Sequence, residues 1–219
     1  MRYTICMDKA AELRALEAEL AAAPLPLRES NLVFGEGNIN CDVMFIGEAP
    51  GENEDRLKRP FVGRGGQLLD EMIKSIGWKR EDVYITNIVK RRPPANRDPL
   101  PEEIEAYKPY LMSQIDIIAP RIIVTLGRFS MNYFLPEAKI TRDHGRVFNI
   151  DDRIIFPVYH PAAALRSPID MGGVLKEDFQ KLPKILKGDY AAEVAAAVVT
   201  APARAAPKKR EKPKQQGLF

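Results

Sequence analysis

The feature that most constrains this chain is a series of short apolar runs set apart by segments with helical spacing. Strand-length runs lie at about 43–47, 83–89, 122–126 and 154–159. Amphipathic or helix-forming stretches lie at about 8–23, 67–76, 101–119, 128–134 and 173–187. Strands that alternate with helices are typical of a parallel sheet with helices on both faces. We therefore expect an α/β fold, a three-layer α/β/α sandwich with a short, mainly parallel four-stranded sheet.

Composition is that of an ordinary globular protein, with 45% hydrophobic and 29% charged residues among 219. No apolar stretch approaches the roughly 20 residues that span a bilayer. The N-terminus resembles no secretory signal. The two cysteines, Cys6 and Cys41, have neither metal-site nor disulfide-framework spacing. We expect a cytoplasmic monomer with no membrane contact.

The net charge of +3 is unevenly distributed along the chain. Residues 201–219 carry six basic side chains and one acidic one, a local +5, so residues 1–200 sum to −2. From Gly188 onward the chain is rich in Ala, Pro and Lys without a sustained apolar face. We therefore predict a folded domain over 1–188 and a flexible basic tether over 189–214.

Residues suited to chemistry follow the ends of three predicted strands. Gly47-Glu48-Ala49-Pro50-Gly51 follows the first apolar run, Asn87 lies near the end of the second, and His160-Pro161 follows the fourth. Ligands of open α/β sheets bind outside the carboxyl ends of the strands. These residues are therefore expected to meet at one site.

The motifs around these positions resemble the thermostable, iron–sulfur class of uracil-DNA glycosylases. The resemblance rests on Gly47 to Asp55, Arg59 to Arg64, Tyr84 to Pro99, and His160 to Arg166, in that order, and it extends from about Val33 to Lys187. It implies an enzyme of base excision repair. Such an enzyme flips deoxyuridine out of DNA and hydrolyses the N-glycosidic bond, which releases uracil and leaves an abasic site.

The same resemblance assigns residues to the uracil pocket. Phe61 is similar to the aromatic ring that stacks on the base, and Asn87 to the asparagine that reads its Watson–Crick edge. Gly47 and Ala49 belong to the turn that lines the pocket, and Ala49 stands where another branch of the superfamily has an aspartate. The alternative is that Phe61 is a core residue and Asn87 a strand-end cap.

For catalysis, His160 resembles the histidine that donates a hydrogen bond to uracil O2 as negative charge develops there. Glu54 is expected to stabilise the cationic sugar and Glu48 to shape the pocket. The alternative for Glu54 and its acidic neighbours is a solvated acidic turn.

Basic residues flank these motifs and are expected to bind DNA phosphates. Leu165 or Arg166 is expected to act as a wedge in the gap left by the flipped base. An ordinary solvated basic loop is the alternative. The expected phosphate contacts are Arg64, Lys90, Arg91, Arg92, Arg97 and Arg166.

The chain departs from the class at the four cysteines that hold its iron–sulfur cluster. The corresponding positions carry Leu20, Ala23, Arg91 and Tyr107. We therefore predict that this protein has no iron–sulfur cluster, metal or other cofactor. Leu20, Ala23 and Tyr107 are expected to pack together as an apolar substitute for the cluster.

The last five residues, Gln215 to Phe219, resemble peptides that bind sliding clamps. Two apolar anchors on a mobile tether suit such binding, and a terminus without a partner is the alternative. Two other functions stay open: a glycosylase for another deaminated base, and a non-catalytic, clamp-tethered DNA-binding module. The presence of Glu54, Asn87 and His160 in one chain favours an enzyme.

Overall fold

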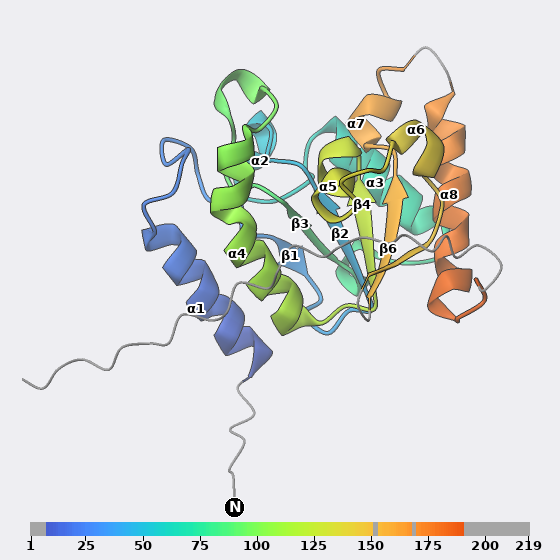
Figure 1. Cartoon of the computed structure of the whole chain (residues 1–219), viewed down its shortest axis with the longest axis horizontal. Coiled ribbons are helices and arrows are strands. Elements are labelled where there is room, and N and C mark those ends of the chain that lie inside the picture. Colours follow the sequence, from blue (N-terminus) through green and yellow to red (C-terminus); the bar gives the residue numbers. More distant parts are fainter. Residues whose placement is uncertain (1–7, 151–152, 168–169, 191–219) are drawn as a thin grey trace, which may run out of the picture.

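A computed structural model describes residues 8–150, 153–167 and 170–190 of the chain. Its centre is one sheet with the strand order β1-β3-β2-β4-β6-β5 (Figure 1). The four inner strands are parallel to one another: β3 (Tyr84–Asn87), β2 (Val43–Gly47), β4 (Ile122–Leu126) and β6 (Arg153–Val158). These are the four strands that the sequence predicts.

The expected sheet of four strands is too small, because the described residues form six. The additional edge strands, β1 (Glu36–Gly37) and β5 (Phe148–Ile150), each pair antiparallel with their neighbour. Strands of two and three residues are too short to produce a recognisable alternation of apolar and polar residues. The α/β sandwich itself is as predicted.

Helices cover both faces of the sheet (Figure 1). On one face α1 (Lys9–Ala22) packs against α4 (Pro101–Ile118), and on the other α3 (Arg64–Ser75) packs against α8 (Met171–Leu186). Each face has its own apolar cluster of buried side chains. The strands are buried between the two clusters, which explains why their sequences are almost continuously apolar.

Short helices lie in the connections between the longer elements. They are α2 (Glu52–Leu57), α5 (Arg128–Phe134), α6 (Ile140–Asp143) and α7 (Pro161–Ala164), together with the 3₁₀ turns η1 (Arg80–Asp82) and η2 (Pro94–Asn96). Of these, the sequence predicts only α5. Most of the others have four residues or fewer, and periodicity detects such elements poorly.

The described residues contain no helix that is both long and apolar enough to cross a membrane. The predicted folded domain over 1–188 corresponds to most of the described residues. The proposed clamp-binding peptide at 215–219 and nearly all of the predicted tether lie outside them, as does Cys6.

Candidate active site

The carboxyl ends of the parallel strands bring the predicted site residues together. Gly47 at the end of β2 is paired in register with Asn87 at the end of β3. A Cβ atom on Gly47 would lie 2.4 Å from Asn87 Oδ1 and 2.5 Å from Cζ of Phe61. Only a glycine allows the amide and the ring to approach each other here.

Asn87 presents an unsatisfied acceptor at this point. The residue is 1% exposed, and its Oδ1 has no hydrogen-bond partner among the residues that the structure describes. A buried polar atom without a partner destabilises the fold by about 1–3 kcal/mol, so such an atom calls for an explanation. The missing partner of this atom, which lies beside Gly47 together with the Phe61 ring, is explained if a ligand supplies the donor.

Phe61 is held in an uncommon backbone conformation. Its φ is +50°, in the left-handed region that bulky residues rarely adopt, and its side chain is 7% exposed. Glu54 Oε1 accepts hydrogen bonds from the backbone N–H groups of Val62 (2.9 Å) and Gly63 (2.7 Å). The carboxylate therefore fixes the loop that carries the ring, so Glu54 is not a free acid in a solvated turn.

His160 follows β6 and is the N-cap of α7. Its Nδ1 accepts a hydrogen bond from the N–H of Ala162 at 3.1 Å, so the hydrogen of the neutral ring is on Nε2. Burial and the charge of Arg166 lower the pKa of His160 to about 4, against a weaker opposing effect of Glu54. The imidazole is thus neutral at pH 7, with its centroid 5.7 Å from that of Phe61.

Glu48 directly follows Gly47 and is half-buried. Burial is the largest cause that raises the pKa of Glu48 to about 7; the charge of Asp98 raises it further, and that of Arg128 opposes the shift. Asp98 and Arg128 form an ion pair at 2.6 Å. A carboxyl group that titrates near neutral pH at a strand end is a common property of active sites.

The structure separates the predicted phosphate contacts into two groups. Arg64, Arg97 and Arg166 are exposed and Arg92 is half-buried, while the proposed wedge Leu165 is 43% exposed. Arg97 also forms a bidentate ion pair with Glu103. Four arginines thus remain as candidates for a DNA-binding surface.

The prediction that Lys90 and Arg91 bind DNA is wrong. Lys90 is completely buried and donates to Thr86 Oγ1 at 2.5 Å and to Gln114 Oε1 at 2.6 Å. Arg91 is also buried, and it donates to the carbonyl oxygen of Ser30. The basic run in the sequence gives no sign of this, because burial depends on how β3 packs against the segments around it.

Three of the four positions assigned to cluster ligands are buried, and the fourth, Ala23, is half-buried at the end of α1. Leu20 and Tyr107 are buried in the same apolar cluster, and the Tyr107 hydroxyl donates to the carbonyl oxygen of Pro26 at 2.6 Å. Burial raises the pKa of Tyr107, and the nearby guanidinium of Arg91 opposes this rise. Leu, Ala, Arg and Tyr offer no thiolate, so these positions do not fit an iron–sulfur cluster. Within the described residues, no group of three or more His, Cys, Asp or Glu side chains is arranged to hold a metal.

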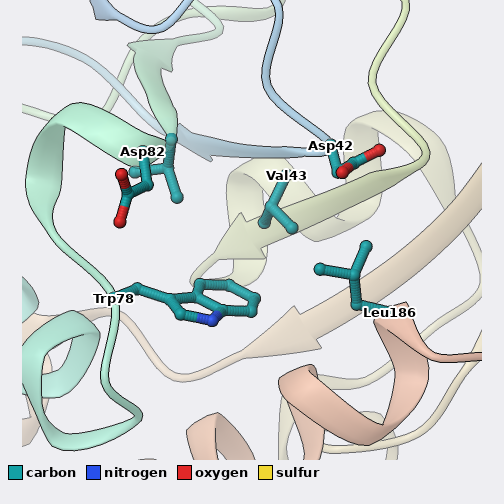
Figure 2. Close-up of a pocket in the computed structure, with 6 residues that line it drawn as sticks. Asp42, Val43, Trp78, Asp82 and Leu186 are labelled. Atoms are coloured by element: carbon teal, nitrogen blue, oxygen red, sulfur yellow. The ribbon is translucent and has the colours of Figure 1, made fainter.

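A pocket of about 250 Å³ lies at the opposite end of the strands (Figure 2). Trp78 and Leu186 face the start of β2 at Val43, and Asp42 and Asp82 stand at the sides. These are the amino ends of the strands, where open α/β sheets rarely bind ligands. None of the predicted site residues lines it.

Comparisons with known proteins identify the family to which this chain is similar. A model of the uracil DNA glycosylase superfamily matches residues 34–186. The chain is 51% identical to the type-4 uracil-DNA glycosylase of Sulfurisphaera tokodaii over 166 residues, 71% of this chain and 75% of the relative. It is 50% identical to that of Saccharolobus solfataricus, over 71% of this chain and 76% of the relative. The chain is 42% identical to the type-4 uracil-DNA glycosylase of Thermotoga maritima, over 76% of this chain and 88% of the relative.

Proposed function

The chain belongs to the uracil DNA glycosylase superfamily, and on this premise we propose that its pocket at the carboxyl ends of β2, β3 and β6 hydrolyses the N-glycosidic bond of deoxyuridine in DNA. The products are free uracil and an abasic site. The observation that carries the proposal is the unpartnered, buried Oδ1 of Asn87, which lies beside Gly47 together with the ring of Phe61.

Asn87 reads the base through its amide. Oδ1 accepts the N3–H of uracil, and the amide N–H₂ donates to O4. Cytosine has an unprotonated N3 and an amino group at these positions, so both contacts would be unfavourable. Phe61 stacks on the flipped base, and the absence of a side chain on Gly47 lets the Phe61 ring and the Asn87 amide lie beside each other.

His160 stabilises the departing base. As the glycosidic bond breaks, negative charge develops on uracil, and the Nε2–H of the neutral imidazole donates to O2. A neutral donor suffices for this, which agrees with a pKa of about 4. The cap formed by the N–H of Ala162 keeps the hydrogen on the nitrogen that the base needs.

The two carboxylates act on the sugar side of the bond. Glu54 holds the Phe61 loop through Val62 and Gly63, and its charge favours a cationic sugar. Glu48 forms the wall of the pocket next to Gly47. DNA is held through Arg64, Arg92, Arg97 and Arg166, with Leu165 as the wedge.

The enzyme needs no iron–sulfur cluster. The positions of the four ligands are filled by Leu20, Ala23, Arg91 and Tyr107, and hydrogen bonds from Tyr107 to Pro26 and from Arg91 to Ser30 tie the 26–30 segment to the core. Leu20 and Tyr107 lie in one apolar cluster, and Arg91 and Tyr107, which we call the polar plug, add these hydrogen bonds to it. Purified protein is expected to be colourless; stoichiometric iron and sulfide by elemental analysis would contradict this.

A further partner is proposed from the sequence alone. The peptide 215–219, carried on the tether 189–214, is expected to bind a sliding clamp. Titration of a purified clamp with the full chain, and with a chain that ends at Lys214, checks this. Equal affinity of the two chains would remove the peptide from consideration.

Single-turnover cleavage of a labelled, uracil-containing oligonucleotide tests the function. We expect abasic-site formation opposite guanine or in single strands, and none with thymine or cytosine in place of uracil. Asn87→Asp should lose the preference for uracil, because a carboxylate cannot donate to O4. If the wild-type protein binds the oligonucleotide and releases no base, the chain is a DNA-binding module instead.

A further inference from the structure

We propose that Arg80 is a positioning residue of the uracil pocket, whose guanidinium fixes the main chain of Pro60 and Phe61 and thereby the ring that stacks on the base. The inference rests on the proposed function, because it takes Phe61 as the stacking ring. Arg80 lies outside the pocket, in the turn η1 that precedes β3.

The contacts of Arg80 with the loop are made to two successive carbonyl groups. Its Nη2 donates to the Pro60 oxygen at 2.6 Å, and its Nη1 donates to the Phe61 oxygen at 3.3 Å. A guanidinium is planar and carries its donors in a fixed fork, so it can fix two neighbouring acceptors at once. A lysine ammonium has no such geometry.

The guanidinium is itself held in place by two acidic side chains. Glu36 Oε1 accepts from Nε at 3.0 Å and from Nη2 at 2.8 Å, and Asp70 Oδ1 accepts from Nη1 at 2.7 Å. Glu36 belongs to β1 and Asp70 to α3. Only 19% of the Arg80 side chain is exposed. The Arg80 guanidinium is thus bound to the sheet through Glu36 and to α3 through Asp70, in addition to its bonds with the loop.

The two arginines, Arg59 and Arg80, form ion pairs with the carboxylates of Glu36 and Asp70. Burial alone would raise the pKa of Glu36, but the hydrogen bonds and charges of Arg59 and Arg80 outweigh it, so the pKa is lowered. Glu36 therefore stays ionised and keeps its hold on both arginines. Arg59 bonds to Glu36 on the outer side, with 59% of its own side chain exposed, and makes none of the contacts with the two loop carbonyls.

The Phe61 loop needs support on two sides because of its backbone conformation. A φ of +50° is unfavourable for phenylalanine and persists only where surrounding contacts enforce it. Glu54 holds the N–H groups of Val62 and Gly63, which follow the ring, and Arg80 holds the carbonyl groups of Pro60 and Phe61. Loss of Arg80 leaves one support, and the backbone can relax toward a common conformation.

Such relaxation would displace the Phe61 ring even though no residue that touches the base has been substituted. Misplacement of a reacting group by about 1 Å can lower a rate about 100-fold. Arg80 therefore acts on uracil release through Phe61, and its effect should disappear when the ring is absent.

A double-mutant cycle tests this coupling. Single-turnover rates of uracil release at saturating enzyme are measured for the wild type, Arg80→Gln, Phe61→Ala and the double variant. We expect Arg80→Gln to lower the rate by about 10- to 100-fold. In the Phe61→Ala background the same change should lower it by less than about twofold, since no ring remains to be positioned.

Two further variants separate positioning from folding. Arg80→Lys keeps the charge between Glu36 and Asp70 but cannot fix both carbonyls, so it should also be slow and can replace Arg80→Gln in the cycle if that variant does not fold. Arg59→Gln removes a bond to the same Glu36 and should change the rate by less than about twofold. Thermal unfolding confirms that each variant is folded at the assay temperature.

Multiplicative effects of Arg80 and Phe61 substitutions, or an equal loss of rate in Arg59→Gln, would overturn the inference while the wild type still releases uracil. A wild-type enzyme that releases no uracil would overturn the proposed function and this inference with it.

Discussion

At the scale of single residues, the site depends on the absent side chain of Gly47 and on the absent hydrogen-bond partner of Asn87 Oδ1. Gly47 has no side chain, and the space above it is shared by the Asn87 amide and the Phe61 ring. The orphan Oδ1 of Asn87 is unfavourable in the free protein, and the proposed ligand supplies its donor. Recognition of the base is therefore built into the fold before the base arrives.

Gly47→Ala should abolish uracil release, because its methyl group would overlap Asn87 Oδ1 and Phe61 Cζ. The single-turnover rate is expected to fall by at least about 100-fold, and overpacking should destabilise the protein by about 1–3 kcal/mol. Gly172→Ala, in the first turn of α8 with no atom closer than 3.7 Å to the added Cβ, is the matched control and should leave the rate unchanged. A near-normal rate in Gly47→Ala would contradict the position assigned to the base.

Glu48 should make the stability of the protein depend on pH. Its pKa of about 7 in the fold exceeds the value of 4.5 for a free glutamate, so the fold favours the protonated form. Stability from this group is present below pH 4.5 and is lost as the pH rises to about 7. Glu48→Gln should then raise the free energy of unfolding by about 1–2 kcal/mol at pH 8, with partial exposure taken into account, and much less at pH 4.5. Chemical denaturation at the two pH values measures this; equal gains at both would contradict the shift.

His160 should place the acid limit of the reaction unusually low. The pKa of about 4 lies below the 6.5 of a free imidazole, so the fold favours the neutral form, and stability from this group is lost as the pH falls from 6.5 to about 4. We expect no loss of single-turnover rate from this group between pH 8 and pH 5.5. A titration with a midpoint near 6.5 that persists in Glu48→Gln and disappears in His160→Gln would show that the imidazole is not shielded.

At the scale of elements, the segment from the end of β3 to Arg97 contributes both to the buried core and to the exposed surface. Asn87 ends β3 with a buried, unpartnered Oδ1, Lys90 and Arg91 are buried and hydrogen-bonded, and Arg92 and Arg97 reach the surface. The sequence predicts the inner strands, the main helices and the convergence of Gly47, Asn87 and His160, because apolar runs and strand ends are local signals. It cannot predict the burial of Lys90, since that depends on Gln114, which is distant in the chain.

The two kinds of basic residue should differ in the salt dependence of DNA binding. Lys90→Met removes a fully buried amino group, whose pKa burial lowers well below its usual value, and should leave the slope of log K against log salt unchanged. Arg166→Gln removes an exposed charge and should reduce that slope by about one. Fluorescence anisotropy with an abasic-site oligonucleotide at several salt concentrations measures both. If a folded Lys90→Met variant shows a reduced slope, Lys90 does contact DNA and the prediction is contradicted.

At the scale of the whole molecule, two apolar clusters pack on the two faces of one sheet, and the site lies at one end of the strands between them. The role of Arg80 joins these parts, since it connects β1, α3 and the Phe61 loop. Nothing in the local sequence around Arg80 indicates it, because its partners come from three separate segments. The polar plug of Arg91 and Tyr107 likewise becomes visible only when α1, α4 and the 26–30 segment are seen together.

Tyr107→Phe tests whether the plug stabilises the fold apart from catalysis. Loss of the hydrogen bond to Pro26 leaves a half-buried carbonyl without its donor and should lower the free energy of unfolding by about 1 kcal/mol. The single-turnover rate at 25 °C should stay within about twofold, because this hydroxyl group takes no part in the proposed chemistry. Denaturation and rate measurements on one preparation check both; an unchanged stability would remove the plug from the account of the fold.

The cap on His160 has a consequence for the order of proton movements. With Nδ1 engaged by Ala162, the ring offers the base a nitrogen that already carries hydrogen, and it has no free lone pair for a water molecule. The imidazole can therefore ease the exit of uracil but cannot deprotonate the nucleophile that replaces it. In the proposed reaction, the proton that water gives up must therefore go to a group other than His160.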